Sequence, residues 1–265
     1  MKKIDLIKVE HSVKIGDICQ YKTPNVTEDA IFYIDGKPVG FYISKLPEKA
    51  AKLADIANAE LKSKNVPKSE MTRSQNIMKG YAETGKRGTE NLVEQMSCIL
   101  GSVPPKPHMR RPYPTISSVH SVKTAQTFIK AMVLLAAESE NIIKDILPEQ
   151  YIIQSKLLSD VGTKWKFSNL FTSSISNYNI PAPYHRDTGN IEGTVNVIIC
   201  KKHNSNGGDL NIPDFDATIG QKDNSILVYP VWRNIHGVTP ILPITEDGYR
   251  NSLVFYPLKA FKGLE

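Results

Sequence analysis

Two histidines and an aspartate in the second half of the chain have the side chains needed to hold a metal ion. His185 and Asp187 are separated by one residue, and His236 follows in an apolar stretch flanked by proline. On a strand, residues two apart point to the same face, so His185 and Asp187 can reach one ion together. Two imidazoles and one carboxylate are the facial ligand set of non-haem Fe(II), which leaves three coordination positions open.

An arginine downstream of these residues adds a second chemical function. Arg250 lies in the run YRNSLVFY (249–256), which reads as a strand. Its planar guanidinium matches a carboxylate bidentately, so Arg250 is a natural clamp for a dicarboxylate co-substrate. Gly207 and Gly208 lie between the two histidines, where glycine lets the backbone pass close to a pocket. An isolated H-x-D is usually a surface turn, but the ordered set within one β-rich segment favours a metal site.

The elements that position these residues are predicted from hydrophobic periodicity and from turn residues. The second half is β-rich, and its clearest strands are residues 194–200, 225–231 and 251–258. Residues 31–34 and 39–43, joined by Asp35-Gly36, predict a hairpin. Helices are expected over 47–63, 90–100 and 122–146. The apolar side of the last helix is expected to consist of Phe128, Ile129, Met132, Val133, Leu134 and Leu135.

Composition and charge limit the classes of protein to be considered. The chain has 265 residues, of which 40% are hydrophobic and 23% charged, and no apolar run is long enough to span a membrane. We expect no signal peptide, and three scattered cysteines suggest a reducing compartment. Residues 45–130 carry 15 Lys and Arg against 7 Asp and Glu, whereas residues 151–265 carry 11 against 10. This basic half fits a polyanionic partner such as nucleic acid, although a solvated basic surface is an equal alternative.

Three motifs resemble those of a known family. YHRDTGN (184–190), IHGVTPI (235–241) and YRNSLVFY (249–256) are similar to motifs of the TET/JBP-type Fe(II)/2-oxoglutarate dioxygenases, which oxidise the 5-methyl group of pyrimidines in DNA. The resemblance covers roughly residues 165–260. It implies an α+β fold with a double-stranded β-helix (jelly-roll, cupin-like) core over residues 151–265. Residues 1–150 would then form a helical and β support region that packs on the core and partly contacts DNA.

The resemblance also implies a role for each matching residue. His185, Asp187 and His236 would bind Fe(II), and Arg250 with Ser252 would bind 2-oxoglutarate, with O2 as the second co-substrate. Asn190 would contact a flipped pyrimidine base and Tyr256 would stack on it, because the methyl group must leave the duplex to be reached. From the residues alone, Tyr256 could equally be a core aromatic, and Asn190 a turn residue that binds its own backbone.

The chain departs from the family pattern in two places. Animal TET enzymes have a cysteine-rich zinc-binding region, which three scattered cysteines cannot form. Leu258 stands where those enzymes have a histidine after the stacking tyrosine, so both 5-methylcytosine, which we favour, and thymine remain open as substrates. The compact chain resembles the small bacteriophage members of this family. We expect a monomer in the cytoplasm of a bacterial or phage-infected host cell, with no membrane partner.

Two basic segments are candidates for contact with the phosphates of double-stranded DNA. Segment 79–87 contributes Lys86 and Arg87, and the proline-rich segment 103–115, which we expect to be an extended surface loop, contributes Lys106, Arg110 and Arg111. Arg73 could also reach the active site.

Two other functions are consistent with the same residues. One is a 2-oxoglutarate oxygenase that acts on a protein or a small molecule, and the other is a non-catalytic DNA-binding module on a decayed oxygenase fold. The base-contact motifs argue against the first, and the intact ligand set with Arg250 argues against the second.

Overall fold

The computed structural model describes residues 1–70 and 95–265. Within them the helices are α1 (Glu48–Lys62), α3 (Gln126–Ile146) and α4 (Pro148–Leu157). The strands are β1 (Lys2–Asp5), β2 (Ala30–Ile34), β3 (Lys37–Ile43), β4 (Ser69–Glu70), β5 (Met96–Val103), β6 (Thr115–Ile116), β7 (Ser173–Tyr178), β8 (Ala182–His185), β9 (Asn196–His203), β10 (Ser205–Gly207), β11 (Leu210–Ile212), β12 (Ala217–Ile219), β13 (Ser225–Tyr229), β14 (His236–Val238), β15 (Ile241–Pro243) and β16 (Tyr249–Tyr256).

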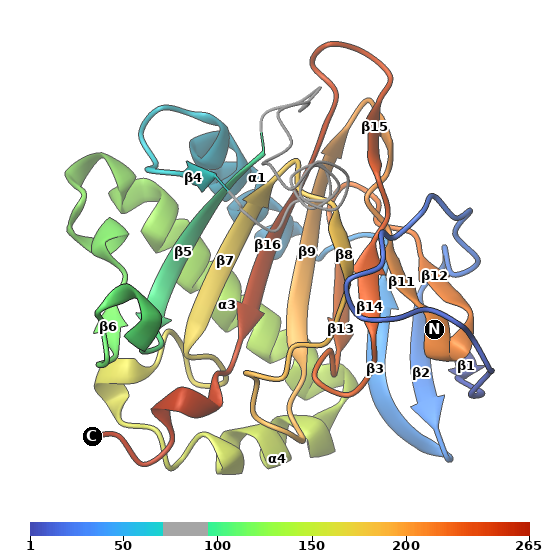
Figure 1. The fold of residues 1–265 in the computed structure, drawn as a ribbon, viewed down its shortest axis with the longest axis horizontal. Coiled ribbons are helices and arrows are strands. Elements are labelled where there is room, and N and C mark those ends of the chain that lie inside the picture. Colours follow the sequence, from blue (N-terminus) through green and yellow to red (C-terminus); the bar gives the residue numbers. More distant parts are fainter. Residues whose placement is uncertain (71–94) are drawn as a thin grey trace.

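A large sheet forms the centre of the fold (Figure 1). Its strand order is β1-β2-β3-β13-β9-β16-β7-β5-β4, and every pair is antiparallel except β1 with β2. Strand β16 is bonded on both sides, since Leu253 is opposite Ile199 of β9 and Ser176 of β7. Strands from the first and second halves of the chain therefore share this sheet, and the division at residue 150 stays a prediction.

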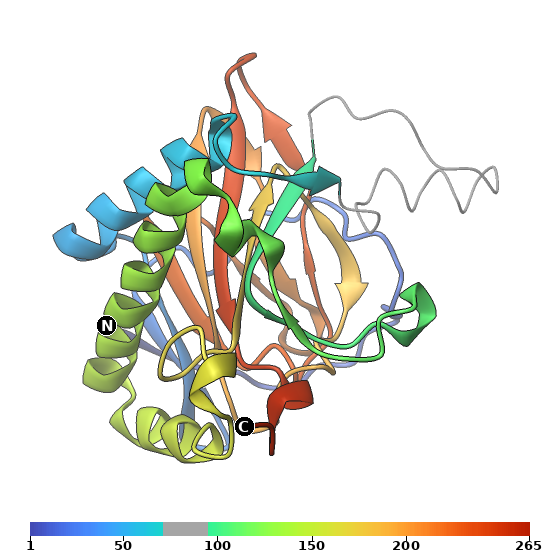
Figure 2. The same cartoon turned by 90° about the vertical axis from the view of Figure 1, so that its left-hand side faces the viewer.

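The two faces of the large sheet are covered differently (Figure 1, Figure 2). Helices α1 and α3 cover one face, where Phe128, Met132 and Leu135 of α3 belong to the same buried cluster as Ile199 and Leu253. A smaller sheet of order β12-β11-β14-β8 covers part of the other face. The space between the two sheets is where the predicted site residues meet.

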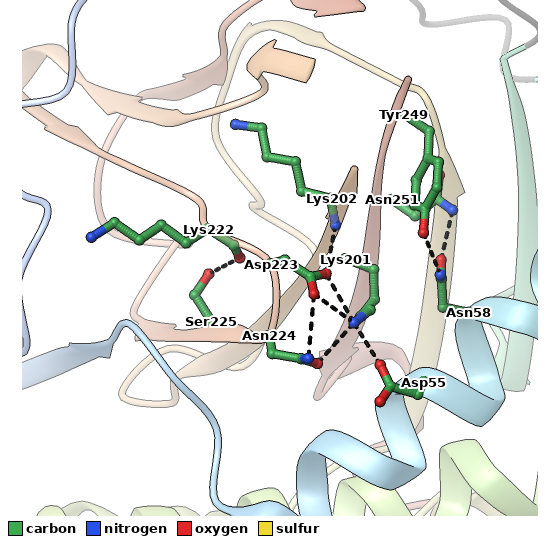
Figure 3. A network of polar contacts seen from close by, with 10 residues as sticks. All are labelled: Asp55, Asn58, Lys201, Lys202, Lys222, Asp223, Asn224, Ser225, Tyr249 and Asn251. Atoms are coloured by element: carbon green, nitrogen blue, oxygen red, sulfur yellow. Dashed lines mark hydrogen bonds and ion pairs between the residues drawn. The ribbon is translucent and has the colours of Figure 1, made fainter. Parts of the chain in front are cut away.

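Helix α1 is joined to the large sheet by a buried lysine (Figure 3). The Nζ of Lys201 in β9 lies 2.6 Å from Asp55 of α1, 2.9 Å from Asp223 and 2.9 Å from Asn224 Oδ1. Burial opposes the charge of this lysine, whose side chain is only 5% exposed, but the hydrogen bonds and charges of Asp223 and Asp55 outweigh burial and raise its pKa. Lys201 therefore stays charged in the fold.

A second polar contact joins the same helix to β16. Asn58 of α1 donates to the hydroxyl of Tyr249 at 3.0 Å and accepts from Asn251 Nδ2 at 2.8 Å (Figure 3). Asn58 and Asn251 are both buried, so each amide provides the hydrogen bond that the other can no longer make to water. The face of β16 opposite the space between the sheets is thereby fixed in place.

Most of the predicted elements are confirmed. The hairpin forms as β2 and β3, the helix expected over 47–63 is α1, and the helix expected over 122–146 contains α3. The three clearest strands form as β9, β13 and β16. On α3, however, Val133 and Leu134 are 37% and 45% exposed, so the apolar side is narrower than we expected.

Three predictions need correction. The helix expected over 90–100 is wrong where the structure describes it, because Met96–Val103 forms β5; this strand lies mostly buried, and a continuous buried run has no strand alternation. Helix α4 was not predicted, because its apolar residues do not collect on one side. Residues 103–115 do not run as an extended loop: they fold back, with Lys106 and Arg111 exchanging backbone hydrogen bonds around the short 3-10 helix Pro107–Met109.

We predict that Lys201→Ala lowers the free energy of unfolding by about 1–3 kcal/mol, because it leaves Asp55 and Asp223 without their cation. The loss is limited because both carboxylates are about half exposed and can be solvated. Urea unfolding followed by circular dichroism measures it. The control is Lys222→Ala, an exposed lysine bonded to the Thr27 carbonyl, which should change stability by no more than about 0.5 kcal/mol. Equal losses in the two variants would contradict the role of Lys201.

Candidate active site

The three predicted metal ligands come together in the structure. His185 ends β8 and His236 begins β14, and these residues are direct partners in the antiparallel pairing of the two strands. Asp187 lies two residues beyond the end of β8. One ligand atom from each residue lies within 4.8 Å of the others, and the two imidazole centres are 4.3 Å apart.

Hydrogen bonds to the backbone set the tautomer of both imidazoles. Nδ1 of His185 donates to the carbonyl oxygen of Pro183 at 2.8 Å, and Nδ1 of His236 donates to that of Asn234 at 3.1 Å. A carbonyl oxygen can only accept, so the proton of each neutral ring is on Nδ1 and the lone pair is on Nε2. Burial lowers the pKa of His236 to about 4, and the charge of His185 acts in the same direction. His236 is therefore neutral at physiological pH, as a metal ligand must be.

A cavity of about 390 Å³ extends from these ligands between the two sheets. Alternate residues of β16 face it, because side chains two apart on a strand lie on one face. These are Arg250, Ser252, Val254 and Tyr256. The neighbouring strands contribute Ile175 and Asn177 from β7, and Asn196 and Ile198 from β9. The cavity thus has polar groups at its two ends and apolar side chains between them.

Arg250 carries a buried charge with no ionic partner among the described residues. The residue is 3% exposed, no carboxylate in the described ranges forms an ion pair with it, and its Nε has no hydrogen-bond partner there. A buried charge without a counterion is strongly unfavourable, so this end of the cavity fits an anionic ligand. Ser252 also faces it and accepts a hydrogen bond from Asn177 Nδ2 at 3.2 Å, which leaves the serine proton for another acceptor.

The turn at Gly207 and Gly208 packs directly on Arg250. Both glycines have positive φ angles, and a Cβ on Gly208 would lie 2.9 Å from the methylene carbons of Arg250. Lys202 holds this turn by donating from Nζ to the carbonyl of Gly207 at 2.6 Å and to that of Gln221 at 3.1 Å. The expectation that these glycines allow close approach to a pocket is confirmed, and the pocket wall they approach is the arginine itself.

The residues predicted to meet the base lie at the other end of the cavity. Asn190 is 3% exposed, and its Nδ2 donates to Asn196 Oδ1 at 3.0 Å. The turn that contains Asn190 is held by its backbone N–H, which donates to the Asp187 carbonyl at 3.1 Å, so the side chain is not needed for the turn. Tyr256 and Leu258 line the same region, and burial raises the pKa of the Tyr256 hydroxyl.

The predicted DNA-contact residues have different surroundings. Arg110 is exposed, with a positive φ of 58°. The guanidinium of Arg111 instead donates to the Pro104 carbonyl at 2.6 Å and to the Thr115 hydroxyl, so its donors are used within its own loop. Lys106 and Arg111 line a second hollow and not the cavity described above.

The remaining basic residues that we singled out, Arg73, Lys86 and Arg87, lie outside the described residues. The folded loop 103–115 lies on the face of the large sheet opposite the helices, which is the side of the smaller sheet (Figure 2).

Among the residues not predicted for the site are three polar ones that line or support the cavity: Asn177, Asn196 and Lys202. A signal for Asn196 was present, since an asparagine within the apolar run TVNVIIC (194–200) requires a hydrogen-bond partner if the strand is buried. The signal for Asn177 and Lys202 was weaker, because both belong to polar stretches that look solvent-exposed.

Comparison with known proteins shows the fold. No protein-family model matches the chain, and no curated protein matches it either. Among solved structures, NgTET1 in complex with 5mC DNA is similar, with 14% sequence identity and a TM-score of 0.61 over 98% of this chain and 83% of that one. The predicted α+β double-stranded β-helix fold is thereby confirmed.

Two further solved structures are more distant. A 2OG-Fe(II) oxygenase family oxidoreductase from Burkholderia pseudomallei has 12% identity and a TM-score of 0.42, covering 81% of this chain and 84% of that one. OsALKBH1 has 14% identity and a TM-score of 0.36, covering 89% of this chain and 100% of that one. TM-scores this low do not show a fold shared with this chain.

We predict that the protein binds one Co(II) ion, used as a spectroscopic probe, and that His236→Ala weakens this binding by at least about tenfold, since one of three ligands is lost. Titration followed by visible absorbance measures the affinity. His203→Ala is the matched control, because His203 is half-exposed and pairs with Asp247 away from the cavity. Equal affinities for the His236→Ala variant and the unmodified protein would rule out this metal site.

Proposed function

We propose that the protein is an Fe(II)- and 2-oxoglutarate-dependent dioxygenase that hydroxylates the 5-methyl group of a pyrimidine in DNA, with 5-methylcytosine favoured over thymine. The observation that carries the proposal is a single cavity that contains both a His-Asp-His cluster and a buried arginine without a counterion. The three sequence motifs support it. The fold shared with NgTET1, which was solved in complex with 5mC DNA, is consistent with it.

The donor set fits Fe(II). His185 and His236 offer Nε2 lone pairs that their backbone hydrogen bonds direct, and Asp187 offers a carboxylate oxygen. When bound, Fe(II) and 2-oxoglutarate supply the oxidising chemistry that uses O2 to convert a C–H bond into C–OH, with release of succinate and CO2. The protein itself positions these groups and limits the access of water.

Arg250 and Ser252 bind the distal carboxylate of 2-oxoglutarate in this proposal. The carboxylate neutralises the buried guanidinium, and Ser252 donates its proton to the same group because its oxygen already accepts from Asn177. The turn at Gly207 and Gly208 restricts the arginine side chain, so little rotamer entropy is lost when the ligand binds.

The other end of the cavity receives the base. Tyr256 provides a stacking surface for a flipped pyrimidine, and Asn190 provides an edge contact. The apolar side chains of Ile175, Ile198 and Val254 line the space between the two ends, and they keep the methyl group and the metal ligands in a site with little water.

The phosphates of double-stranded DNA bind outside the cavity. We assign this role to Lys106, Arg110 and Arg111, together with Lys86 and Arg87 of the undescribed segment. Arg110 is the best placed of the described residues because its side chain is exposed, whereas Arg111 is engaged within the loop. In this proposal residues 1–150 are a support region that partly contacts DNA, and residues 151–265 are the catalytic core.

The proposal also extends to the setting of the enzyme. Among the described residues, no helix is long and apolar enough to cross a membrane. We propose a compact, phage-type member of the TET/JBP-type enzymes that acts as a monomer in the cytoplasm of a bacterial or phage-infected host cell. The three scattered cysteines, which suggest a reducing compartment, support this assignment.

We predict that incubation with Fe(II), 2-oxoglutarate and DNA that contains both 5-methylcytosine and thymine produces a 5-hydroxymethyl nucleoside with equivalent succinate. Nucleoside mass spectrometry identifies the oxidised base, and succinate formation with and without DNA measures coupling. His236→Ala should abolish both products, because it removes a metal ligand.

Succinate formation that DNA does not stimulate, with no oxidised nucleoside, would overturn the DNA substrate. It would favour an oxygenase acting on a protein or a small molecule. Absence of any succinate in the presence of Fe(II) would overturn the enzymatic proposal altogether.

We predict that Arg110→Ala weakens binding to DNA of any sequence and reduces the slope of log affinity against log salt by about 1, because one phosphate contact is lost. Fluorescence anisotropy with two unrelated duplexes at several salt concentrations measures both quantities. Lys49→Ala is the control. It removes the same charge from an exposed position on helix α1, on the opposite face of the large sheet. The same slope for Arg110→Ala and Lys49→Ala would remove the assignment.

A further inference from the structure

Two buried asparagines face each other at the base end of the cavity. Asn190 and Asn196 are 3% and 2% exposed, both line the cavity, and they share one hydrogen bond of 3.0 Å from Asn190 Nδ2 to Asn196 Oδ1. Asn190 lies in the turn after β8, whereas Asn196 begins β9 opposite Tyr229 of β13. The turn after β8 and the start of β9, only six residues apart, therefore bring a pair of carboxamides to one place.

The single bond uses only half of the hydrogen-bonding capacity of the pair. Each carboxamide has one oxygen that accepts and one NH2 group that donates. After this bond is made, the Oδ1 of Asn190 and the Nδ2 of Asn196 are left on the cavity wall. An acceptor and a donor on the wall of a cavity fit a ligand that carries the complementary pair.

The surroundings of the two asparagines restrict what that ligand can be. Tyr256 lines the same end of the cavity and offers an aromatic face, while Leu258, Ile198 and Val254 offer only apolar contacts. A planar ring that stacks on Tyr256 and presents a neighbouring donor and acceptor along one edge satisfies all of these groups. The pyrimidine edge has this pattern, with the exocyclic group at position 4 next to N3.

We propose that Asn196 is a specificity residue that, together with Asn190, hydrogen-bonds the Watson–Crick edge of the flipped pyrimidine. This inference rests on the proposed function and adds to it a residue that the sequence motifs do not assign. Leu258 cannot make a polar contact with the base, so the carboxamide pair takes over the recognition of its edge.

The pair can read either base. Rotation of both amides by 180° exchanges the remaining donor and acceptor while it keeps the bond between the asparagines. One arrangement matches cytosine, which has a donor at position 4 and an acceptor at N3. The other matches thymine, which has an acceptor at position 4 and a donor at N3. The pair of asparagines alone therefore does not choose between the two bases.

Asn196→Asp removes this freedom. A carboxylate at position 196 only accepts, so Asn190 must turn its NH2 group toward it, and both remaining atoms are acceptors. Each base then keeps one contact and loses the other, because cytosine donates its exocyclic amine while its N3 meets an acceptor, and thymine donates from N3 while its exocyclic oxygen meets an acceptor. We expect kcat/KM to fall by roughly fivefold or more for both bases, in line with the cost of one lost base contact.

The experiment uses two duplexes that differ at one position. One contains a single 5-methylcytosine, the other a single thymine, and deoxyuridine replaces thymine everywhere else so that each duplex has one methyl group to oxidise. Initial rates give kcat/KM for each duplex, and fluorescence anisotropy without 2-oxoglutarate gives binding in the absence of turnover. Asn196→Ala should lower kcat/KM for both duplexes by about tenfold, because a base contact is lost and nothing replaces it.

The matched control is Asn251→Asp. Asn251 is buried in β16 like the cavity residues of that strand, but it faces helix α1, where it bonds Asn58 (Figure 3). This variant should leave kcat/KM for both duplexes unchanged, even if it unfolds more easily. The affinity of Asn196→Asp for 2-oxoglutarate should stay within about twofold of that of the unmodified protein, since Arg250 is at the other end of the cavity.

The outcomes separate this inference from the proposed function. A loss of kcat/KM and of DNA binding in both Asn196 variants, with the affinity for 2-oxoglutarate kept, supports the role of Asn196. Unchanged kcat/KM in Asn196→Asp, or an equally large loss of affinity for 2-oxoglutarate, would mean that Asn196 only stabilises the cavity, and would overturn the inference while the enzymatic proposal stands. An unmodified protein that oxidises neither duplex would overturn the proposed function instead.

Discussion

The burial of one permanent positive charge is the constraint on which the site depends. The guanidinium charge of Arg250 belongs to a residue that is only 3% exposed, on a strand within the large sheet. Lys202 adds a second cation nearby and is held by the carbonyls of Gly207 and Gln221, with Asp209 at 3.9 Å. The described residues provide no carboxylate for Arg250, so this end of the cavity is arranged to bind an anionic ligand.

The two faces of β16 show how this arrangement is supported. The cavity face carries Arg250 and Tyr256, while the opposite face carries Asn251 and Leu253, which contact the helix layer. Among the described residues, the helices contribute none to the lining of the cavity. The helices hold β16 on the face opposite the cavity, through Asn58 and through the apolar core. The side chains on the cavity face of β16 are therefore attached to a backbone that is held in place.

Much of this organisation could be predicted from the sequence, because alternation along strands is visible in the residues themselves. Alternation predicted the strand that carries Arg250 and the common face of Arg250 and Ser252. It could not predict β5, since a strand buried on most positions has no alternation to detect. The use of the Arg111 guanidinium within its own loop also escaped prediction, because its partners, the Pro104 carbonyl and the Thr115 hydroxyl, depend on how the loop folds back. Asn196 also escaped prediction, although its partner Asn190 is only six residues away, because the turn between them decides whether the two side chains meet.

Strand β16 also fixes the distance between the two ends of the cavity. Arg250 and Tyr256 are six residues apart on one strand that is hydrogen-bonded along both edges, so their Cα atoms are separated by roughly 20 Å. Neither end can shift alone, and a slip of one residue would turn both side chains away from the cavity. The backbone therefore sets the combined length of the ligands that bind at the two ends of the cavity. Change in substrate has to come from the side chains between and around the ends, such as Ile198, Val254 and Asn196, and not from the distance that separates them.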